Sequence, residues 1–231
     1  MYEERRSARV PAVVWSRTAG VRQERVLPDG CTDLIWDGTE LFVAGPDTRA
    51  HRPDAPPGTR YTALRFPPGT GPAVFGVPAH ELRDRRLPLA ALRPEAEVRR
   101  LAERVAGAAD PAEVLERAAA GALRGAGPAD PRRAAVVAGL RAGLTVAEVA
   151  ERAGLGVRGL HRLSLTAFGY GPKTLARILR MNRALDLARG GRPLAETAAL
   201  AGYCDQAHLT REVRALAGLP PALLLAPPPS G

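Results

Sequence analysis

An internal repeat in the C-terminal part of the chain constrains the fold more than any other sequence feature. The first copy contains Ala150, Gly154, Leu160, Gly169, Pro172 and Leu175, and the second contains Ala198, Gly202, Leu209, Gly218, Pro221 and Leu224. The first two pairs are 48 residues apart and the other four are 49 apart, so the second copy carries one extra residue in its turn. Two copies are too few for a solenoid, and the repeat therefore predicts two similar helical units.

The first copy has the sequence chemistry of a helix-turn-helix unit. The segment TVAEVAERAG predicts a helix that begins at Thr145, because Thr145 and Glu148 have the spacing of a capping box. Ala150 is small enough for a second helix to cross over it, and Gly154 permits a sharp turn between the helices. The second helix is expected over residues 157–167.

The second copy repeats this arrangement with a different turn. Residues 194–202 predict the first helix, Tyr203 and Cys204 the turn, and Asp205 the N-cap of the helix that follows. An ordinary α-hairpin is the structural alternative. Two copies in register within a basic segment favour the helix-turn-helix interpretation.

Positive charge is concentrated in the same part of the chain. Residues 131–231 hold 14 Lys and Arg against 6 Asp and Glu, a net charge of +8, whereas residues 1–130 hold 19 against 18, a net charge of +1. A general bias toward arginine is the alternative explanation, but such a bias would raise the positive charge of both parts equally. The basic part is therefore expected to bind a polyanion, and the near-neutral part to have another role.

The N-terminal part predicts a different secondary structure. Residues 1–92 read as β-rich, because the apolar runs VPAVVW, CTDLIW, ELFVAG and YTALRF are broken by Pro, Gly and Asp, and the Asp37-Gly38 pair predicts a tight hairpin. Residues 93–130 predict a helical connector of two helices divided at Asp110-Pro111. The expected fold class is α+β, with a β-rich effector or sensor domain (1–92), this connector (93–130) and an all-α domain (131–231) whose two helix-turn-helix units are joined by a long helix.

Three segments of the C-terminal part carry a family pattern: AERAGLGVRGLHRL, GYGPKTLARILRMNRALDLAR and LAETAALAGYCDQAHLTREVRALAGLPPALL. Together they resemble the DNA-binding domain of the AraC/XylS family of transcription regulators, over roughly residues 133–225. The most specific piece is AGYCDQAHLTREVRALAGLPP, which is close to the family pattern A-x-G-[FY]-x-D-Q-x-H-F-x-R-x-F-[KR]-x-x-x-G-x-[ST]-P. The resemblance implies seven helices, with a long central helix from near Pro172 to about Arg189.

The N-terminal part also resembles a known domain. The segments RVLPDGCTDLIWDGTELFVAGPDT and LRFPPGTGPAVFGVPAHELRD are similar to the N-terminal domain of a mostly actinobacterial subset of this family. The place of this domain in the chain implies effector sensing by analogy with other family members.

The resemblance also implies which side chains face DNA. Two recognition helices about one turn of DNA apart, roughly 34 Å, enter successive major grooves, so a single chain reads two subsites. The side chains expected to point outward are Arg158, His161 and Arg162 in the first helix, and Gln206, Ala207 and Arg211 in the second. Arginine can bond guanine in a bidentate manner and glutamine can bond adenine, which makes Arg162 and Arg211 the strongest candidates for base contact. Thr210 either contacts a phosphate or is solvated.

Three further features bear on this interface. Arg177, Arg180 and Arg183 recur at a spacing of three along the central helix, and they either contact backbone phosphates or form a solvated face. His208 is expected to pack at the start of its helix. Ser164 stands where the family usually has a phenylalanine, and a large-to-small change in a core typically costs about 2–5 kcal/mol. Leu165 or Phe168 is available to fill the space.

The N-terminal part contains one cluster with possible chemistry. Cys31, Asp33 and Trp36 either line a ligand pocket or belong to a turn with a buried cysteine and tryptophan. His51 and His80 are isolated, and no residues have the spacing of a metal site or of a nucleophile with its base. No metal, no cofactor and no enzymatic activity are expected.

The sequence thus predicts a sequence-specific, DNA-binding transcription regulator of the bacterial cytoplasm and nucleoid, with double-stranded DNA as its partner. The chain has no apolar run long enough for a membrane span and no secretory signal at MYEERRSARV. A small-molecule effector and RNA polymerase are further candidate partners, and both a monomer and a homodimer are compatible with the sequence. The alternatives are a small-molecule-binding protein with a degenerate DNA-binding domain, which Ser164 favours, and a DNA-modifying enzyme, whose chemistry the residues lack.

Overall fold

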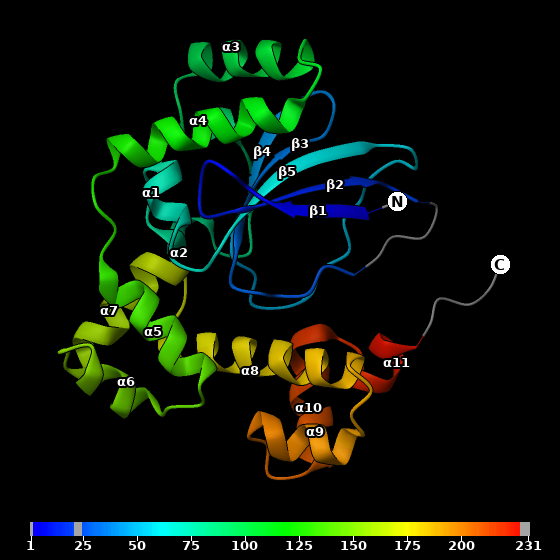
Figure 1. The fold of residues 1–231 in the computed structure, drawn as a ribbon, viewed down its shortest axis with the longest axis vertical. Coiled ribbons are helices and arrows are strands. Elements are labelled where there is room, and N and C mark those ends of the chain that lie inside the picture. Colours follow the sequence, from blue (N-terminus) through cyan, green and yellow to red (C-terminus); the bar gives the residue numbers. More distant parts are fainter. Residues whose placement is uncertain (1, 21–24, 227–231) are drawn as a thin grey trace.

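The computed structural model describes residues 2–20 and 25–226 of the chain and has an α+β fold (Figure 1). The strands of this described part are β1 (Tyr2–Arg6), β2 (Val13–Thr18), β3 (Thr32–Trp36), β4 (Leu41–Ala44), β5 (Arg60–Phe66) and β6 (Arg86–Pro88). Its helices are α1 (Gly71–Phe75), α2 (Ala79–Leu82), α3 (Glu95–Ala106), α4 (Pro111–Gly125), α5 (Pro131–Arg141), α6 (Val146–Arg152), α7 (Val157–Phe168), α8 (Pro172–Arg189), α9 (Leu194–Ala201), α10 (Gln206–Ala217) and α11 (Pro221–Leu225), with a short 3-10 turn at Leu89–Ala91.

The strands form one antiparallel sheet in the order β1-β2-β5-β3-β4-β6. The predicted hairpin is confirmed between β3 and β4, where Trp36 pairs with Leu41. Asp37 begins its four-residue loop, and its carboxylate accepts hydrogen bonds from the backbone N–H groups of Thr39 and Glu40 (2.8 Å each). Gly38 has a φ of +98°, a conformation that glycine adopts at little cost.

One face of the sheet is covered by α1, α3 and α4, which lie across it in Figure 1. Alternate strand residues such as Leu34, Leu64 and Phe66 are buried against Phe75 of α1 and Leu115 of α4. The two helices of the predicted connector therefore share a hydrophobic core with the sheet. Their division is as predicted, since Asp110 caps α4 by accepting from Ala112 N (2.9 Å) and Pro111 is its first residue.

The other half of the described chain consists of the seven helices α5 to α11, the number that the family resemblance implies. They share one continuous core, in which α8 is central: Leu175, Ile178, Met181 and Leu185 of α8 are fully buried. Helix α8 spans Pro172–Arg189, which confirms the predicted long helix. It runs beneath the sheet and joins two helical clusters, one at each of its ends (Figure 1).

Strands β1 and β6 and helices α1 and α2 of the N-terminal part were not predicted. Strand β1 reads YEERR, and all five residues are exposed, so it has no apolar alternation by which a sequence pattern would detect it. It is an edge strand, and its charged side chains protect that edge from pairing with another chain. Helices α1 and α2 have five and four residues, too short for a helical period to be visible.

Candidate DNA-binding surface

Two helix-turn-helix units lie at opposite ends of α8, the first built from α6 and α7 and the second from α9 and α10 (Figure 1). Residues at equivalent positions of the sequence repeat are buried at equivalent places in the two units. Ala150 and Ala198 are buried in the first helix of each unit, and Leu160 and Leu209 are buried in the second helix. The sequence repeat is therefore a structural repeat.

The turns of the two units differ by the one residue that the sequence offset predicts. Each first helix ends at a glycine in the left-handed region, where a side chain is rarely accommodated: Gly154 has a φ of +63° and Gly202 a φ of +80°. Two residues separate Gly154 from α7, whereas three separate Gly202 from α10. The additional residue allows Asp205 to act as the N-cap of α10, where its carboxylate accepts from His208 N (2.6 Å).

The first unit is capped as the sequence predicts. The Thr145 hydroxyl accepts from Glu148 N (3.2 Å), and the Glu148 carboxylate accepts from Thr145 N (2.7 Å). These hydrogen bonds to the ionised form lower the pKa of Glu148. The reciprocal bonds satisfy two backbone donors at the start of α6 and fix its first turn.

Helix α7 presents three basic side chains to solvent. Its buried side consists of Leu160, Ser164, Ala167 and Phe168, which pack into the shared core. The predicted reading residues Arg158, His161 and Arg162 are all exposed. Neither arginine has an ion-pair partner among the residues that the structure describes. Their guanidinium groups are thus free to donate to an external acceptor.

Helix α10 presents a second edge with a different chemistry. Gln206, Ala207 and Arg211 are exposed, as predicted, whereas Leu209 and Val213 are buried. The arrangement leaves an amide and a guanidinium group exposed at the N-terminal part of the helix.

Two neighbours of this edge have contacts within the protein. Thr210 is half-buried, and its hydroxyl donates to the Gln206 carbonyl oxygen (2.9 Å). The His208 ring packs edge-on against Tyr203 at 5.3 Å between centroids, and its Nδ1 accepts from Cys204 N (3.4 Å). His208 therefore packs at the helix start, as the sequence analysis expects.

The three arginines of α8 do not act as one row. Arg177 donates two hydrogen bonds to the Glu212 carboxylate (2.8 and 3.1 Å), which joins α8 to α10. Arg180 stacks on the Tyr203 ring at 4.7 Å and lies 3.8 Å from Glu212. Arg183 is exposed and points into a cleft beside the N-terminal half. The proximity of Arg177 lowers the pKa of Glu212.

Ser164 lies at the centre of the first unit. Its side chain is fully buried, and its hydroxyl has no hydrogen-bond partner among the described residues. Phe168 is buried beside it in the same core, whereas Leu165 is half-buried. A buried hydroxyl without a partner is costly, so this position destabilises the first unit by its polarity as well as by its small volume.

The structure separates Cys31, Asp33 and Trp36. Trp36 belongs to the core beneath α3 and α4. Asp33 lies on the opposite face of the sheet, where it accepts from Trp15 Nε1 (3.1 Å) and pairs with Arg65 (3.3 Å), and burial raises its pKa to about 6. Only Cys31 lines a cleft, and burial raises the pKa of its thiol.

The N-terminal half docks on the C-terminal ends of both recognition helices, a contact that sequence reasoning missed. At the end of α7, Arg83 Nη1 donates to the Gly169 carbonyl oxygen (3.4 Å). At the end of α10, Ala50 N donates to the Leu216 carbonyl oxygen (2.7 Å). Between them, Asn182 of α8 donates to the Pro28 carbonyl oxygen (2.9 Å). No local sequence signal marks these contacts, because each joins residues far apart in the chain.

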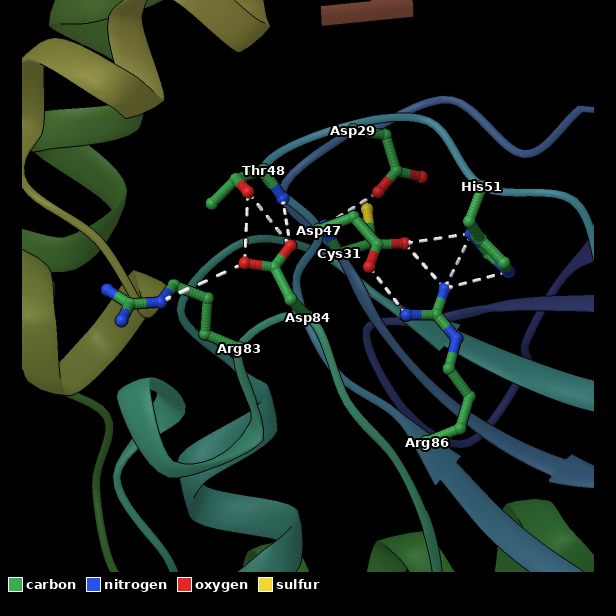
Figure 2. A network of polar contacts seen from close by, with 8 residues as sticks. All are labelled: Asp29, Cys31, Asp47, Thr48, His51, Arg83, Asp84 and Arg86. Carbon is green, nitrogen blue, oxygen red and sulfur yellow. Dashed lines mark hydrogen bonds and ion pairs between the residues drawn. The ribbon is translucent and has the colours of Figure 1, made fainter.

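A polar network holds the docking segment in place (Figure 2). Arg86 makes a bidentate pair with the buried Asp47 (2.5 Å for both bonds), and the His51 ring lies beside both groups. Arg86 and the His51 ring lower the pKa of Asp47. Asp84, with a φ of +57°, accepts from Thr48 N (2.6 Å). The network ties the loop after β4 to the start of β6, and Pro46 and Ala50 of that loop are the residues that reach the DNA-binding half.

Two kinds of feature are absent from the described residues. Within residues 2–20 and 25–226, no group of three or more His, Cys, Asp or Glu side chains is placed to hold a metal ion. Over the same residues, no helix combines the length and the apolar character needed to cross a membrane.

Two family matches cover most of the described chain. Residues 140–226 match a family described as a helix-turn-helix domain. Residues 11–88 match a domain of unknown function (DUF6597). No curated protein sequence matches the chain.

The chain is also similar to solved structures of two named proteins. A probable AraC family transcriptional regulator from Rhodopseudomonas palustris is 22% identical, with a TM-score of 0.36, over 42% of this chain and 95% of that chain. An apo form of ToxT from Vibrio cholerae is 10% identical, with a TM-score of 0.49, over 94% of this chain and 97% of that chain. ToxT bound to an unsaturated fatty acid gives 9% identity and a TM-score of 0.47, over 92% and 93% of the two chains.

The substitution Ser164→Ala is expected to stabilise the protein by about 1 kcal/mol, because it removes a buried hydroxyl that has no partner. Urea unfolding of the full chain measures the change. Thr197→Ala is the control, since Thr197 is equally buried but donates to the Arg192 carbonyl oxygen (3.4 Å), and this variant should be less stable than the wild type. A loss of stability in Ser164→Ala would show that the hydroxyl is satisfied.

Glu212→Gln is expected to destabilise the protein at neutral pH by about 1 kcal/mol, because Arg177 and Arg180 lose their carboxylate. The pKa of Glu212 is lower in the folded state, so its contribution is present above the unfolded pKa and is lost as the pH falls through the folded value. The difference in free energy of unfolding between wild type and variant should therefore shrink on acidification. Glu151→Gln is the control, because Glu151 is exposed and has no ion pair in the described chain. This variant should change neither the free energy of unfolding at neutral pH nor its dependence on pH.

Gly169→Ala is expected to weaken the docking of the N-terminal half. Gly169 and Gly191 both have a φ of +87°, so alanine costs about 1–2 kcal/mol of backbone strain at either position. Only at Gly169 would the new Cβ also meet other atoms, at 2.8 Å from Pro46 Cγ and 3.1 Å from the Ala79 carbonyl oxygen. Hydrogen exchange of residues 45–51 should accelerate in Gly169→Ala and not in Gly191→Ala. Equal exchange in the two variants would refute the close contact.

Proposed function

We propose that this protein is a transcription regulator that reads two successive major grooves with α7 and α10, because residues 140–226 match a helix-turn-helix domain family and residues 11–88 match the DUF6597 family. The observation that carries the proposal is the pair of exposed reading edges on two equivalent units of one rigid helical core. A helix fits the major groove, where the four base pairs present distinguishable edges.

Each edge is assigned its own contacts. In α7, Arg158, His161 and Arg162 contact bases or flanking phosphates, with Arg162 the main base-reading residue. In α10, the contacting residues are Gln206, Ala207, Thr210 and Arg211, with Arg211 reading a base. The different side chains of the two edges imply two unlike subsites, so the DNA site of one chain is not a palindrome.

Contacts with the DNA backbone are assigned to the surrounding positive charge. The net charge of +8 over residues 131–231 favours a polyanion and makes the affinity depend on salt. Arg183 has its guanidinium group exposed and is the α8 arginine most available to a phosphate. Arg177 and Arg180 can reach a phosphate only if they leave Glu212, so their first role is to hold α10 against α8.

The N-terminal half is assigned a modulating role. Residues 1–92 with the helices of 93–130 form the sensor part, and residues 131–231 form the reading part. The sensor part docks on both reading units while their reading edges stay exposed, which favours control of orientation over blocking of the surface. A small-molecule effector and RNA polymerase are the partners proposed besides DNA, and the bacterial cytoplasm is the proposed location. No catalytic role is proposed.

A second candidate function rests on Ser164. A small-molecule-binding protein with a degenerate DNA-binding domain would tolerate the unpartnered hydroxyl in the first unit. The ratio of specific to nonspecific DNA affinity at fixed salt separates the two candidates, because a degenerate domain gives a ratio near one.

Arg211→Ala is expected to weaken binding to a DNA site selected from a random library by about 1–3 kcal/mol and to relax base preference within one subsite. Arg214→Ala is the matched control, because Arg214 is exposed on the same helix but lies in its last turn, away from the reading edge. Gel shifts at fixed salt, on a library randomised one position at a time, measure both effects. Unchanged affinity in Arg211→Ala would show that Arg211 does not contact the bases of the DNA site.

A further inference from the structure

Val157, the first residue of α7, is the most exposed large hydrophobic side chain among the described residues, at 66%. Single exposed apolar side chains are common on protein surfaces and by themselves indicate no function. Val157 differs from them in its place on the first helix-turn-helix unit. We propose that Val157 reads the C5-methyl group of a thymine in the DNA subsite of α7, an inference that rests on the DNA-binding function proposed above.

The structural repeat places Val157 opposite a residue already assigned to base contact. Helices α7 and α10 both have 12 residues. Their first residues, Val157 and Gln206, are 49 positions apart, which is the offset of the sequence repeat and also the offset between Arg162 and Arg211. The place that Gln206 occupies on the reading edge of α10 therefore belongs to Val157 on α7.

Val157 lies at the N-terminal end of the reading edge of α7. His161 follows it by four residues, and residues four apart lie on the same side of a helix. Arg158 comes directly after Val157, and all three side chains are exposed, whereas Leu160 is fully buried in the core. In helix-turn-helix proteins the N-terminal residues of the recognition helix are the ones that contact base edges. Val157 thus belongs to the part of α7 that is expected to lie deepest in the groove.

The surface around the start of α7 is unobstructed. Gly154 and Gly156 precede Val157, and a Cβ on either of them would meet no described atom within 4 Å beyond its chain neighbours. Gly156 is the N-cap of α7 and contributes no side chain, whereas the equivalent place in the second unit holds the carboxylate of Asp205. The first turn of α7 can therefore approach a base edge closely.

The chemistry of valine restricts which base it can recognise. Valine has no hydrogen-bond donor or acceptor in its side chain, so it cannot read a base in the way that Gln206 can. The major-groove edge of thymine carries a methyl group, whereas the edges of guanine, adenine and unmodified cytosine offer hydrogen-bonding groups. Contact between Val157 and this methyl group removes apolar surface from water, and covering one methyl group is worth about a fourfold difference in affinity.

This assignment makes the two subsites different at equivalent positions. The α7 subsite presents a thymine to Val157, whereas the α10 subsite presents an adenine to Gln206. The arginines Arg162 and Arg211 remain equivalent in the two edges. The first residue of each helix is therefore the one that distinguishes the subsites by its chemistry.

The test uses the full chain and a DNA site selected from a random library. Each thymine of the site is replaced in turn by deoxyuridine, which lacks only the methyl group, and affinities are measured by gel shift at fixed salt. At least one replacement should weaken binding by the wild type about fourfold, and Val157→Ala should not distinguish thymine from deoxyuridine at that position. The absence of any deoxyuridine effect, or an equal effect in Val157→Ala, would overturn the proposal.

Leu223→Ala is the matched control for this test. Leu223 is 61% exposed, close to the exposure of Val157, but it lies on α11, outside both reading helices. This variant should discriminate against deoxyuridine as strongly as the wild type does. Loss of the discrimination in Leu223→Ala would show that the effect does not depend on the reading edge and would overturn the proposal.

Two further measurements test the chemistry at the same position of the DNA. When cytosine replaces the sensitive thymine, 5-methylcytosine should bind the wild type more tightly than cytosine, because it restores the methyl group at the same place. Val157→Gln gives α7 the first residue of α10 and should change the preferred base from thymine to adenine. Equal binding of cytosine and 5-methylcytosine, or an unchanged preference for thymine in Val157→Gln, would overturn the assignment.

Failure of the proposed DNA-binding function has a different signature. It would appear as a ratio of specific to nonspecific affinity near one, so that no site is selected from the library. That result would overturn the function and the role of Val157 together. A selected site that binds specifically but shows no deoxyuridine effect would overturn only the role of Val157.

Discussion

Helices α7 and α10 both end at a glycine with a positive φ, and the N-terminal half contacts the helix-turn-helix half at these two glycines. At the end of α7, Gly169 leaves room for Pro46, and a Cβ there would lie 2.8 Å from the proline ring. At the end of α10, a Cβ on Gly218 would lie 2.7 Å from the Arg25 guanidinium group. The two positions are equivalent in the repeat, so the N-terminal half holds both units at matched ends. The N-terminal parts of both helices, which carry the proposed reading residues, remain exposed.

Helix α8 has two structural roles, one for its buried side and one for its other side. Its buried side, with Leu175 and Met181, is the common core of the two units. Its other positions set the units in place, since Arg177 and Arg180 bind Glu212 of α10 and Asn182 binds the N-terminal half. The three equally spaced arginines of this helix therefore have different roles, since Arg177 and Arg180 share Glu212 and Arg183 stays exposed. Spacing along a helix shows which side chains share a face, but the partner packed on that face decides what each side chain does.

Local chemistry explains which parts of the fold could be predicted from the sequence. The capping box at Thr145, the N-cap at Asp205 and the extra residue in the second turn all depend on neighbours within a few positions, and the structure contains each of them. The start of α8 is similarly marked, by Pro172 after a glycine. Such signals fix helix ends because they satisfy backbone groups that the helix itself leaves unpaired.

Tertiary contacts explain what the sequence could not predict. The docking of Ala50 on Leu216 and of Arg83 on Gly169 joins segments more than eighty residues apart, through backbone carbonyls that every residue possesses. Strand β1 is missed for a related reason: its exposed charged residues suit a sheet edge but carry no apolar period. The exposure of Arg158, Arg162 and Arg211 was predictable, because helical periodicity places them opposite the apolar residues of α7 and α10.

The docked arrangement also limits how the N-terminal half can act on DNA binding. The docked N-terminal half leaves the proposed reading edges of α7 and α10 exposed, so these edges are accessible to DNA in this arrangement. Under the proposed function, its influence on DNA binding would pass through the relative placement of the two units, which it touches at both ends of α8. A ligand shifts such an equilibrium only by the difference in its affinity for the two placements, so an effective site must contact both halves.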